Sequence, residues 1–304
     1  LHRVRKFEAN GEIVDVKKSA SKVKHLLFAN GKITRLDSAG KEVEESDTSS
    51  NNRWKVEFPD WYSSSSHYIH LVPKDEVVVK NFQIPMLEDT VHFQVYTSSP
   101  EPMKAFFGSE LKGQTWADVE NELKKIMKDI GDRAGLWIYP KYILNIVGDQ
   151  FAGMEYAGAT ATGYKANFHE LAHSLWGRGN IPASGNDGWI DEAVTAFYDF
   201  NRDFQTHGVP VLYFPAKVRE RSIAGNSPYQ RYTNPTAYID GRDIMQGLMM
   251  TMAKEYSNAR EYSSVTEKSK KKAIDKLNET LNRFLLRTIG RVYDTREFED
   301  HLLS

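Results

Sequence analysis

The spacing of hydrophobic residues changes near residue 87. Before it, short apolar or alternating segments are separated by groups of Gly, Asn, Asp and Ser, which is typical of strands joined by turns. The segments that predict strands here are Lys24–Phe28, Arg53–Phe58, Tyr68–Val72 and Glu76–Val79, with loops at Ser46–Asn52 and Ser63–Ser66. We therefore expect a β-rich N-terminal domain over residues 1–87.

Helical spacing dominates the remainder of the chain, although strands are still expected at Val91–Tyr96 and Ile143–Val147. The segments that predict helices are Thr115–Ile130, Ala166–Trp176, Asp191–Phe204, Asp243–Tyr256 and Lys268–Leu286, and Asp294 is placed to cap a final short helix. Strands that come first and helices that follow favour an α+β fold. We expect the second domain to cover residues 88–304.

Composition narrows the classes of function. The chain has 304 residues and a net charge of −1, so nothing suggests a nucleic-acid partner, and the basic run Lys268–Lys272 is interpreted as a solvated helix face. No apolar run has the roughly 20 residues that cross a bilayer. There is no cysteine, which excludes disulfides and thiolate metal sites. A chain that starts at Leu1, rich in Ser, Asn and Tyr, leads us to favour a secreted or periplasmic location over the cytoplasm; oligomeric state is not indicated.

Residues 169–192 carry the strongest chemical signal. His169, Glu170 and His173 form an HExxH box, and four-residue spacing on a helix places both imidazoles on one face. Eighteen residues then separate His173 from Glu192. Two histidines and one glutamate leave a fourth position on zinc for water, which is the arrangement of a catalytic site. We predict one zinc ion per chain, bound by His169, His173 and Glu192.

The chemistry of such a site is hydrolysis. Zinc lowers the pKa of its bound water to about 7, and Glu170 is placed to take a proton from that water and to give it to the leaving amine. An HExxH box also occurs by chance on surface helices, and a lone glutamate at a helix start is often only a solvated acid. Both signals occur together here, and the helix expected over Ala166–Trp176 is apolar on its other side, at Phe168 and Leu175 for example.

These segments resemble the aminopeptidase N family of zinc metallopeptidases, which are gluzincins. That family commonly has HELAHQWFGN followed after eighteen residues by the glutamate of WLNEGF, where this chain has HELAHSLWGRGN and WIDEAVTAF. Thermolysin-type enzymes are similar but usually have nineteen residues in this gap. The resemblance implies a thermolysin-like catalytic domain and a peptide or protein substrate.

A second matching segment lies upstream. Tyr139–Tyr156 reads YPKYILNIVGDQFAGMEY, where the family has YPxxKLDxVxxPxFxxGAMEN on the edge strand that binds substrate. Gly153, Met154 and Glu155 align with its core. The resemblance implies that Glu155 binds the free α-amine of the substrate and that the backbone around Ala152 and Gly153 pairs with the peptide.

A third segment supplies a candidate for stabilising the oxyanion. Tyr238-Ile239-Asp240-Gly241 precedes the helix expected from Asp243, where the family has YxKG, so the resemblance implies that the Tyr238 hydroxyl donates to the oxyanion. Asp240 replaces the usual lysine. The competing candidates are Tyr229, Tyr232 and His207.

The chain also departs from the family. The gap between Glu155 and His169 is shorter than usual. We also expect an N-terminal β domain less than half the usual size and no counterpart of the large C-terminal helical domain of the family. An open groove is the expected consequence. The sequence therefore leaves three alternatives: the protein is a zinc aminopeptidase, a thermolysin-like endopeptidase or a catalytically silent binding protein of the same fold.

Two further pairs of residues have an ordinary and a functional interpretation. Asp191 and Asp199 are candidates to orient a ligating imidazole, or they are plain helix acids. His67 and His70 could form a second metal site, although packing histidines are more common.

Overall fold

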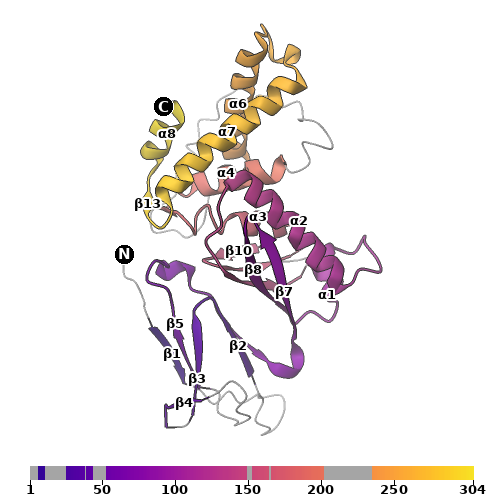
Figure 1. Cartoon of the computed structure of the whole chain (residues 1–304), viewed down its shortest axis with the longest axis vertical. Helices are drawn as coiled ribbons and strands as arrows, with labels where there is room; N and C mark the ends of the chain where they lie inside the picture. Colours follow the sequence, from indigo (N-terminus) through magenta and orange to yellow (C-terminus); the bar gives the residue numbers. More distant parts are fainter. Residues whose placement is uncertain are drawn as a thin grey trace. The chain divides into compact units, whose positions relative to one another are not determined.

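A computed structural model describes residues 6–10, 25–37, 39–43, 53–148, 153–163, 166–201 and 235–304 of the chain. These residues form a mixed α+β structure in which most strands precede the long helices α4, α6 and α7 (Figure 1). The chain divides into two compact units. Unit 1 comprises Leu1–Lys124 and Tyr139–Glu170, and unit 2 comprises Lys125–Ile138 and Leu171–Ser304.

The strands of the first 73 residues form a small sheet and a separate pair. An antiparallel sheet has the order β1-β5-β3-β4, and β2 pairs with β6 antiparallel. Their bounds are Lys6–Asn10 for β1, His25–Ala29 for β2, Lys32–Leu36 for β3, Glu42–Val43 for β4, Arg53–Glu57 for β5 and Ile69–Pro73 for β6. The β-rich character expected of this region is confirmed.

A five-stranded mixed sheet with the order β10-β11-β9-β8-β7 is the main sheet of unit 1. The strands β8, β9 and β11 run parallel, and both outer strands are antiparallel to their neighbours. Their bounds are Val78–Met86 for β7, Asp89–Thr97 for β8, Lys141–Ile146 for β9, Gly153–Tyr156 for β10 and Ala159–Thr162 for β11. The central strand β9 is buried from Tyr142 to Ile146, which explains why its residues are mostly apolar and do not alternate with polar ones; Asn145 is the polar exception.

One face of this sheet packs against the β2–β6 pair. Phe28 on β2 stacks on Tyr96 of β8 with ring centroids 3.7 Å apart, and Tyr68 and Tyr156 belong to the same apolar cluster. Tyr156 thus anchors the end of β10 to the core.

The boundary expected at residue 87 lies in the turn between β7 and β8. These two strands pair over their whole length, from Val78 with Thr97 to Met86 with Asp89, and Leu87 adopts a positive φ of 54° in the turn between them. The two compact units divide the chain at other positions. The division into domains 1–87 and 88–304 remains a prediction.

Unit 2 is mainly helical. Helix α4 packs against α6, α6 against α7, and α7 against α8. Their bounds are Trp189–Phe200 for α4, Pro235–Ser257 for α6, Glu267–Thr288 for α7 and Thr295–Leu303 for α8. The expected cap of the last helix is confirmed, because the Asp294 side chain accepts a hydrogen bond from the Glu297 amide at 2.8 Å.

The remaining elements are short, apart from α2. The helix α1 covers Pro102–Phe107, α2 covers Trp116–Ala134 and α3 covers Asn167–Ala172. The residues Val119, Leu123 and Ile126 share one face of α2, and all three are buried. Two-residue strands, β12 at Ile181–Pro182 and β13 at Val292–Tyr293, pair in parallel within unit 2.

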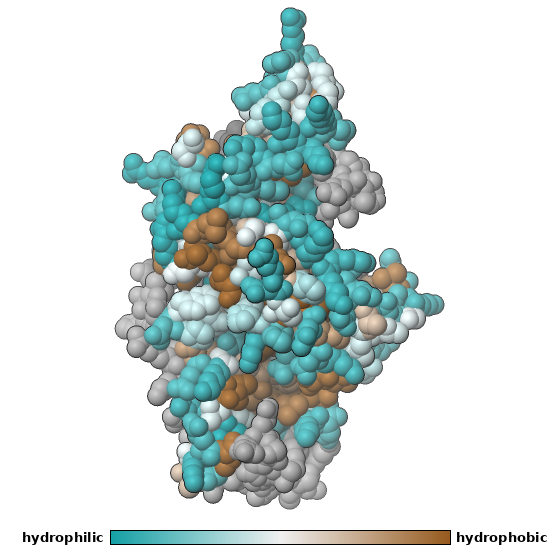
Figure 2. All heavy atoms as spheres, viewed as in Figure 1, coloured by the Kyte–Doolittle hydropathy of each residue, from teal (hydrophilic) through white to brown (hydrophobic). Residues whose placement is uncertain are grey.

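The surface agrees with the interpretation of the basic run on α7. Hydrophilic residues cover most of the face shown in Figure 2, and Lys268, Lys271 and Lys272 are exposed, whereas Lys270 is buried and pairs with Glu267 at 2.7 Å. Among the helices described, none combines the length and the apolar character that a bilayer crossing requires.

Candidate metal centre

The first two ligand candidates lie at the end of the short helix α3. His169 is within the helix, and His173 follows its last residue, Ala172. The α-helix expected over residues 166–176 is therefore too long. Beyond Ala172 the chain continues in tighter turns, with Ser174 N–H donating to the Leu171 carbonyl at 3.2 Å, before a glycine of positive φ, Gly177 at 94°, reverses its direction.

Three side chains converge as the motif predicts. One possible ligand atom from each of His169, His173 and Glu192 lies within 4.8 Å of the others, and within the described ranges this is the one group of three or more such side chains. Glu192 is in the first turn of α4. His173 is 2% exposed and Glu192 7% exposed, whereas His169 is partly exposed, so the group is buried on the side of His173 and Glu192.

The contacts of His173 determine which ring nitrogen faces the group. Its Nδ1 lies 3.2 Å from the Trp176 carbonyl oxygen, and its Nε2 lies 3.1 Å from Oε2 of Glu192. A carbonyl only accepts, so Nδ1 carries the hydrogen and donates it. In the neutral ring the Nε2 lone pair then faces a carboxylate oxygen, and two buried acceptors in contact require a cation between them or a proton on the ring. Two imidazole nitrogens and one carboxylate are the ligand types that zinc takes.

Thr195 is a neighbour of this centre that sequence reasoning did not identify. It lies three residues after Glu192, one turn along the same face of α4, and its Oγ1 is 3.4 Å from Nδ1 of His173. The available signal was this three-residue spacing within WIDEAVTAF. The Trp176 carbonyl and the Thr195 hydroxyl are thus neighbours of Nδ1. The role of Asp191 or Asp199 in orienting a ligating imidazole remains a prediction. Asp191 accepts the Glu192 amide at 2.7 Å.

Glu170, the expected general base, is buried and lies against the edge strand of the sheet. A Cβ placed on Gly153 would be 2.2 Å from Oε1 of Glu170 and 2.3 Å from its Cδ. No real contact is that short, so only glycine at this position leaves room for the carboxylate. Two residues that the sequence assigned separate roles are therefore in direct contact.

The strand for which the resemblance implies substrate binding, β10, lies at an edge of the sheet. β10 is the outermost strand of the five-stranded sheet, with one partner, β11, among the described strands. Alternation puts Glu155 on the same face as Gly153, the side on which Glu170 lies. Met154 and Tyr156 face the other way. Met154 is 44% exposed and Tyr156 packs on Tyr68 with ring centroids 4.9 Å apart.

Tyr238 is placed differently from the expectation. The helix expected to begin at Asp243 begins at Pro235, so the YIDG segment is helical and Tyr238 lies in its first turns, 38% exposed. Gly241 packs closely against α4, because a Cβ on it would lie 2.6 Å from Cβ of Ala193, next to Glu192. The oxyanion role of Tyr238 remains a prediction. Ala152, His207, Tyr229 and Tyr232 lie outside the described residues.

His67 and His70 are packing residues of unit 1 and do not join the metal group. The His67 ring stacks on Phe58 at 3.8 Å, and Nδ1 of His70 lies 2.7 Å from the Tyr96 hydroxyl. Burial lowers the pKa of both imidazoles. It also raises the pKa of the neighbouring Tyr68 to about 12.

Comparison with known proteins supports the fold. No protein-family model and no curated protein sequence matches the chain. Among solved structures, an M1 zinc metallopeptidase from Deinococcus radiodurans is similar with a TM-score of 0.58 and 14% sequence identity, over 91% of this chain and 57% of that chain. This chain has the fold of M1 zinc metallopeptidases.

Two further structures show the same fold. A two-domain M1 zinc metallopeptidase variant bound to L-arginine has a TM-score of 0.60 at 12% identity, again over 91% of this chain and 57% of that one. Aminopeptidase A of Legionella pneumophila, in complex with aspartic acid, has a TM-score of 0.58 at 14% identity and is covered over 31% of its length. The chain thus spans little more than half of the Deinococcus protein, and at these identities the likeness concerns the fold.

Proposed function

We propose that the protein is a zinc-dependent aminopeptidase that hydrolyses N-terminal peptide bonds. The observation that carries this proposal is the convergence of His169, His173 and Glu192 within 4.8 Å at the end of a helix whose Glu170 lies against the edge strand. The fold shared with zinc metallopeptidases supports it.

The donor set fits zinc. His169, His173 and Glu192 would hold the ion, and the Trp176 carbonyl orients the imidazole of His173 by accepting its Nδ1–H. When bound, zinc would acidify water and polarise the scissile carbonyl. The buried pair of His173 and Glu192 gives the ion two ligands that are shielded from solvent.

Glu170 supplies the proton transfers. Its carboxylate would accept a proton from the attacking water and return it to the leaving amine, and this acid–base exchange typically contributes about 10²- to 10⁴-fold to the rate. Burial beside Gly153 restricts the carboxylate to a small region and keeps it aimed at the strand along which a peptide would lie.

Glu155 and the backbone of β10 position the substrate. The free edge of a strand can accept an extended peptide as an additional strand, through main-chain hydrogen bonds. Glu155 faces the Glu170 side of β10, so its carboxylate could bind the α-ammonium group. Tyr238 is proposed to donate its hydroxyl to the oxyanion.

Paired peptides test the function. Each sequence is prepared with a free and with an acetylated N-terminus, and products are measured with and without a zinc chelator. The proposal expects chelator-sensitive release of single N-terminal residues from the free peptides alone. Internal cleavage of both forms would instead identify an endopeptidase. Stoichiometric zinc without any cleavage would favour a binding protein.

A further inference from the structure

The connection between His173 and Glu192 contains little regular structure of its own. Residues 174–188 consist of turns and the two-residue strand β12. Yet the two ligands at its ends have atoms only 3.1 Å apart. Elements that pack against the connection must therefore hold His173 and Glu192 in position.

The C-terminal segment from Thr288 to Thr295 supplies that support through backbone hydrogen bonds. It includes β13, which runs parallel to β12. The backbone bonds are Gly290 N–H to the Gly179 carbonyl at 2.7 Å, Ile181 N–H to the Arg291 carbonyl at 3.1 Å, and Ala183 N–H to the Tyr293 carbonyl at 2.7 Å. The side-chain amide of Asn180 also donates to Thr288 Oγ1 at 3.0 Å. The first half of the connection is thus held as part of a small sheet.

Asp187 links the second half of the connection to the start of α8. Its Oδ1 accepts from both the amide and the hydroxyl of Thr295 at 2.8 Å, and its Oδ2 accepts from the Ser184 hydroxyl at 2.7 Å. Thr295 Oγ1 in turn accepts the indole N–H of Trp189 at 3.2 Å. Trp189 is the first residue of α4, and Glu192 follows within the same turn.

The environment of Tyr293 shows how closely these parts pack. Its side chain is fully buried, and burial raises the pKa of its hydroxyl well above the usual value. The charges of Asp191 and Asp187 raise the pKa further. The Tyr293 hydroxyl therefore lies near two carboxylates, that of Asp187 just before α4 and that of Asp191 in its first turn.

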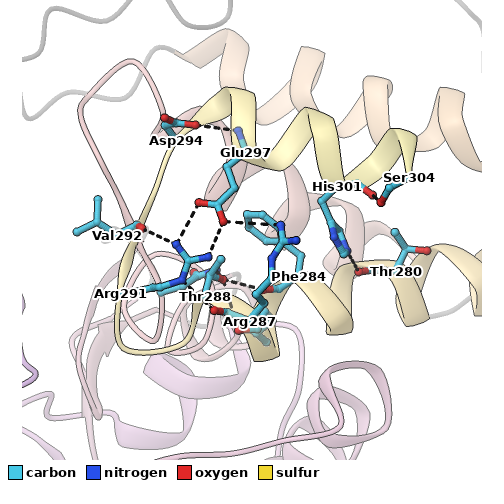
Figure 3. Close-up of polar contacts among 12 residues, drawn as sticks. Thr280, Phe284, Arg287, Thr288, Arg291, Val292, Asp294, Glu297, His301 and Ser304 are labelled. Carbon is cyan, nitrogen blue, oxygen red and sulfur yellow. Dashed lines mark hydrogen bonds and ion pairs between the residues drawn. The ribbon is translucent and has the colours of Figure 1, made fainter.

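Independent contacts attach α8 to α7, as Figure 3 shows. Glu297 of α8 pairs with Arg287 of α7, with Nη2 at 3.7 Å, and it accepts a hydrogen bond from Arg291 Nη1, in the turn after α7, at 3.2 Å. His301 Nε2 bonds the Thr280 carbonyl at 2.9 Å. Helix α8, which begins at Thr295, is therefore held against α7. The Asp187–Thr295 hydrogen bonds thus attach the connection between the two ligands to a helix that is itself supported.

We propose that Asp187 and Thr295 are positioning residues for the metal centre. In the docked state, the C-terminal segment is hydrogen-bonded to the connection, and these two residues couple this docking to zinc affinity through the start of α4. The inference rests on the proposed zinc site. If docking aligns Glu192 with His173, zinc binds the docked state more tightly, and by thermodynamic reciprocity zinc must also favour docking. If the Asp187–Thr295 hydrogen bonds only stabilised the fold, their removal would leave zinc affinity unchanged, and zinc would not favour docking.

Zinc affinity, measured by competition with a chromogenic chelator, tests the first half of this coupling. Asp187→Ala should weaken zinc binding about tenfold, equivalent to about 1.4 kcal/mol. Thr295→Val should weaken it about threefold, and Thr295→Ser, which keeps the hydroxyl, should restore it. Asp294→Ala is the matched control, because it removes a neighbouring acid whose side chain accepts from the Glu297 amide of α8, and it should leave the affinity within about twofold of wild type.

Hydrogen exchange on the wild-type protein tests the reciprocal half and does not depend on whether a variant folds. Zinc should slow exchange at the amides of Phe298 and Ala183 more than at amides in the middle of α6. Asp187→Ala should remove this difference.

The outcomes separate the two proposals. Unchanged affinity in Asp187→Ala, or equal weakening in Asp294→Ala, would overturn the positioning role while zinc binding stands. A uniform effect of zinc on exchange would overturn it as well. Wild-type protein that binds zinc and shows the coupling but cuts no peptide would refute the aminopeptidase and leave the positioning role supported. Wild-type protein that binds no zinc would refute both.

Discussion

The substrate side and the ligand side of the proposed site are organised by opposite means. On the substrate side, a missing side chain creates the arrangement, because glycine at position 153 leaves space for the Glu170 carboxylate. On the ligand side, polar contacts with Trp176 and Thr195 hold His173, and the C-terminal segment holds the start of α4, which bears Glu192. An atom added to a closely packed contact displaces its neighbours at once, whereas a network of several hydrogen bonds keeps part of its effect when one bond is lost.

The largest expected effect separates chemistry from metal binding. Glu170→Gln should lower kcat about 10³-fold or more while zinc stays bound in a one-to-one ratio, because the amide cannot accept the proton and Glu170 is not a ligand. Peptide hydrolysis and metal analysis of the same sample measure both quantities. Loss of the zinc in this variant would contradict the assigned roles.

Gly153→Ala tests the intolerance of the substrate side. The added methyl would meet Glu170 at 2.2 Å, so the carboxylate must move, and we expect kcat to fall about 100-fold with zinc affinity retained. Gly188→Ala is a suitable control because a Cβ there meets nothing closer than 3.5 Å, at a φ of −66° that alanine adopts readily. Wild-type kcat in Gly153→Ala would show that the contact does not position Glu170.

Glu155→Ala should have a smaller and more selective effect. Removal of the carboxylate should lower kcat/KM for peptides with a free α-amine about 30-fold, in the range of a lost charge-assisted hydrogen bond of about 2 kcal/mol. Zinc affinity should not change. Equal kinetics for the variant and wild type would assign Glu155 a structural role.

The smallest expected effect concerns the folding of unit 1 and its dependence on pH. Burial lowers the pKa of His67 below that of the unfolded chain, so the unfolded state binds more protons below about pH 6.5 and stability falls as the pH drops through that window. His67→Phe preserves a ring against Phe58 and removes this titration. Between pH 7 and pH 5.5, in the presence of chelator, Tm should fall less in the variant than in wild type. A parallel fall in both would exclude His67 as a contributor.

Local signals in the sequence predicted much of the site. The helical spacing of His169 and His173, the helix that Glu192 opens, and the cap of Asp294 all depend on residues within one or two turns. The division between strands first and helices after also followed from local periodicity.

Long-range contacts decide what the sequence did not predict. The contact between Gly153 and Glu170 and the bonds of the C-terminal segment to the connection join residues 17 to more than 100 positions apart. The helix α6 continues through Gly241 because that glycine packs on Ala193, where a larger residue would not fit, and local reasoning treated the same glycine as the end of a segment before the helix.

The two edges of the five-stranded sheet also differ in their risk of self-association. An exposed strand edge can pair with another chain, and long edges are the more hazardous. β7 is nine residues long, and it carries an exposed lysine, Lys80, and an exposed proline, Pro85, which are features that disfavour such pairing. β10 is only four residues long and bears Glu155. Because so short a strand offers few main-chain hydrogen bonds, we expect a peptide of a few residues to match it better than the strand of a second folded molecule.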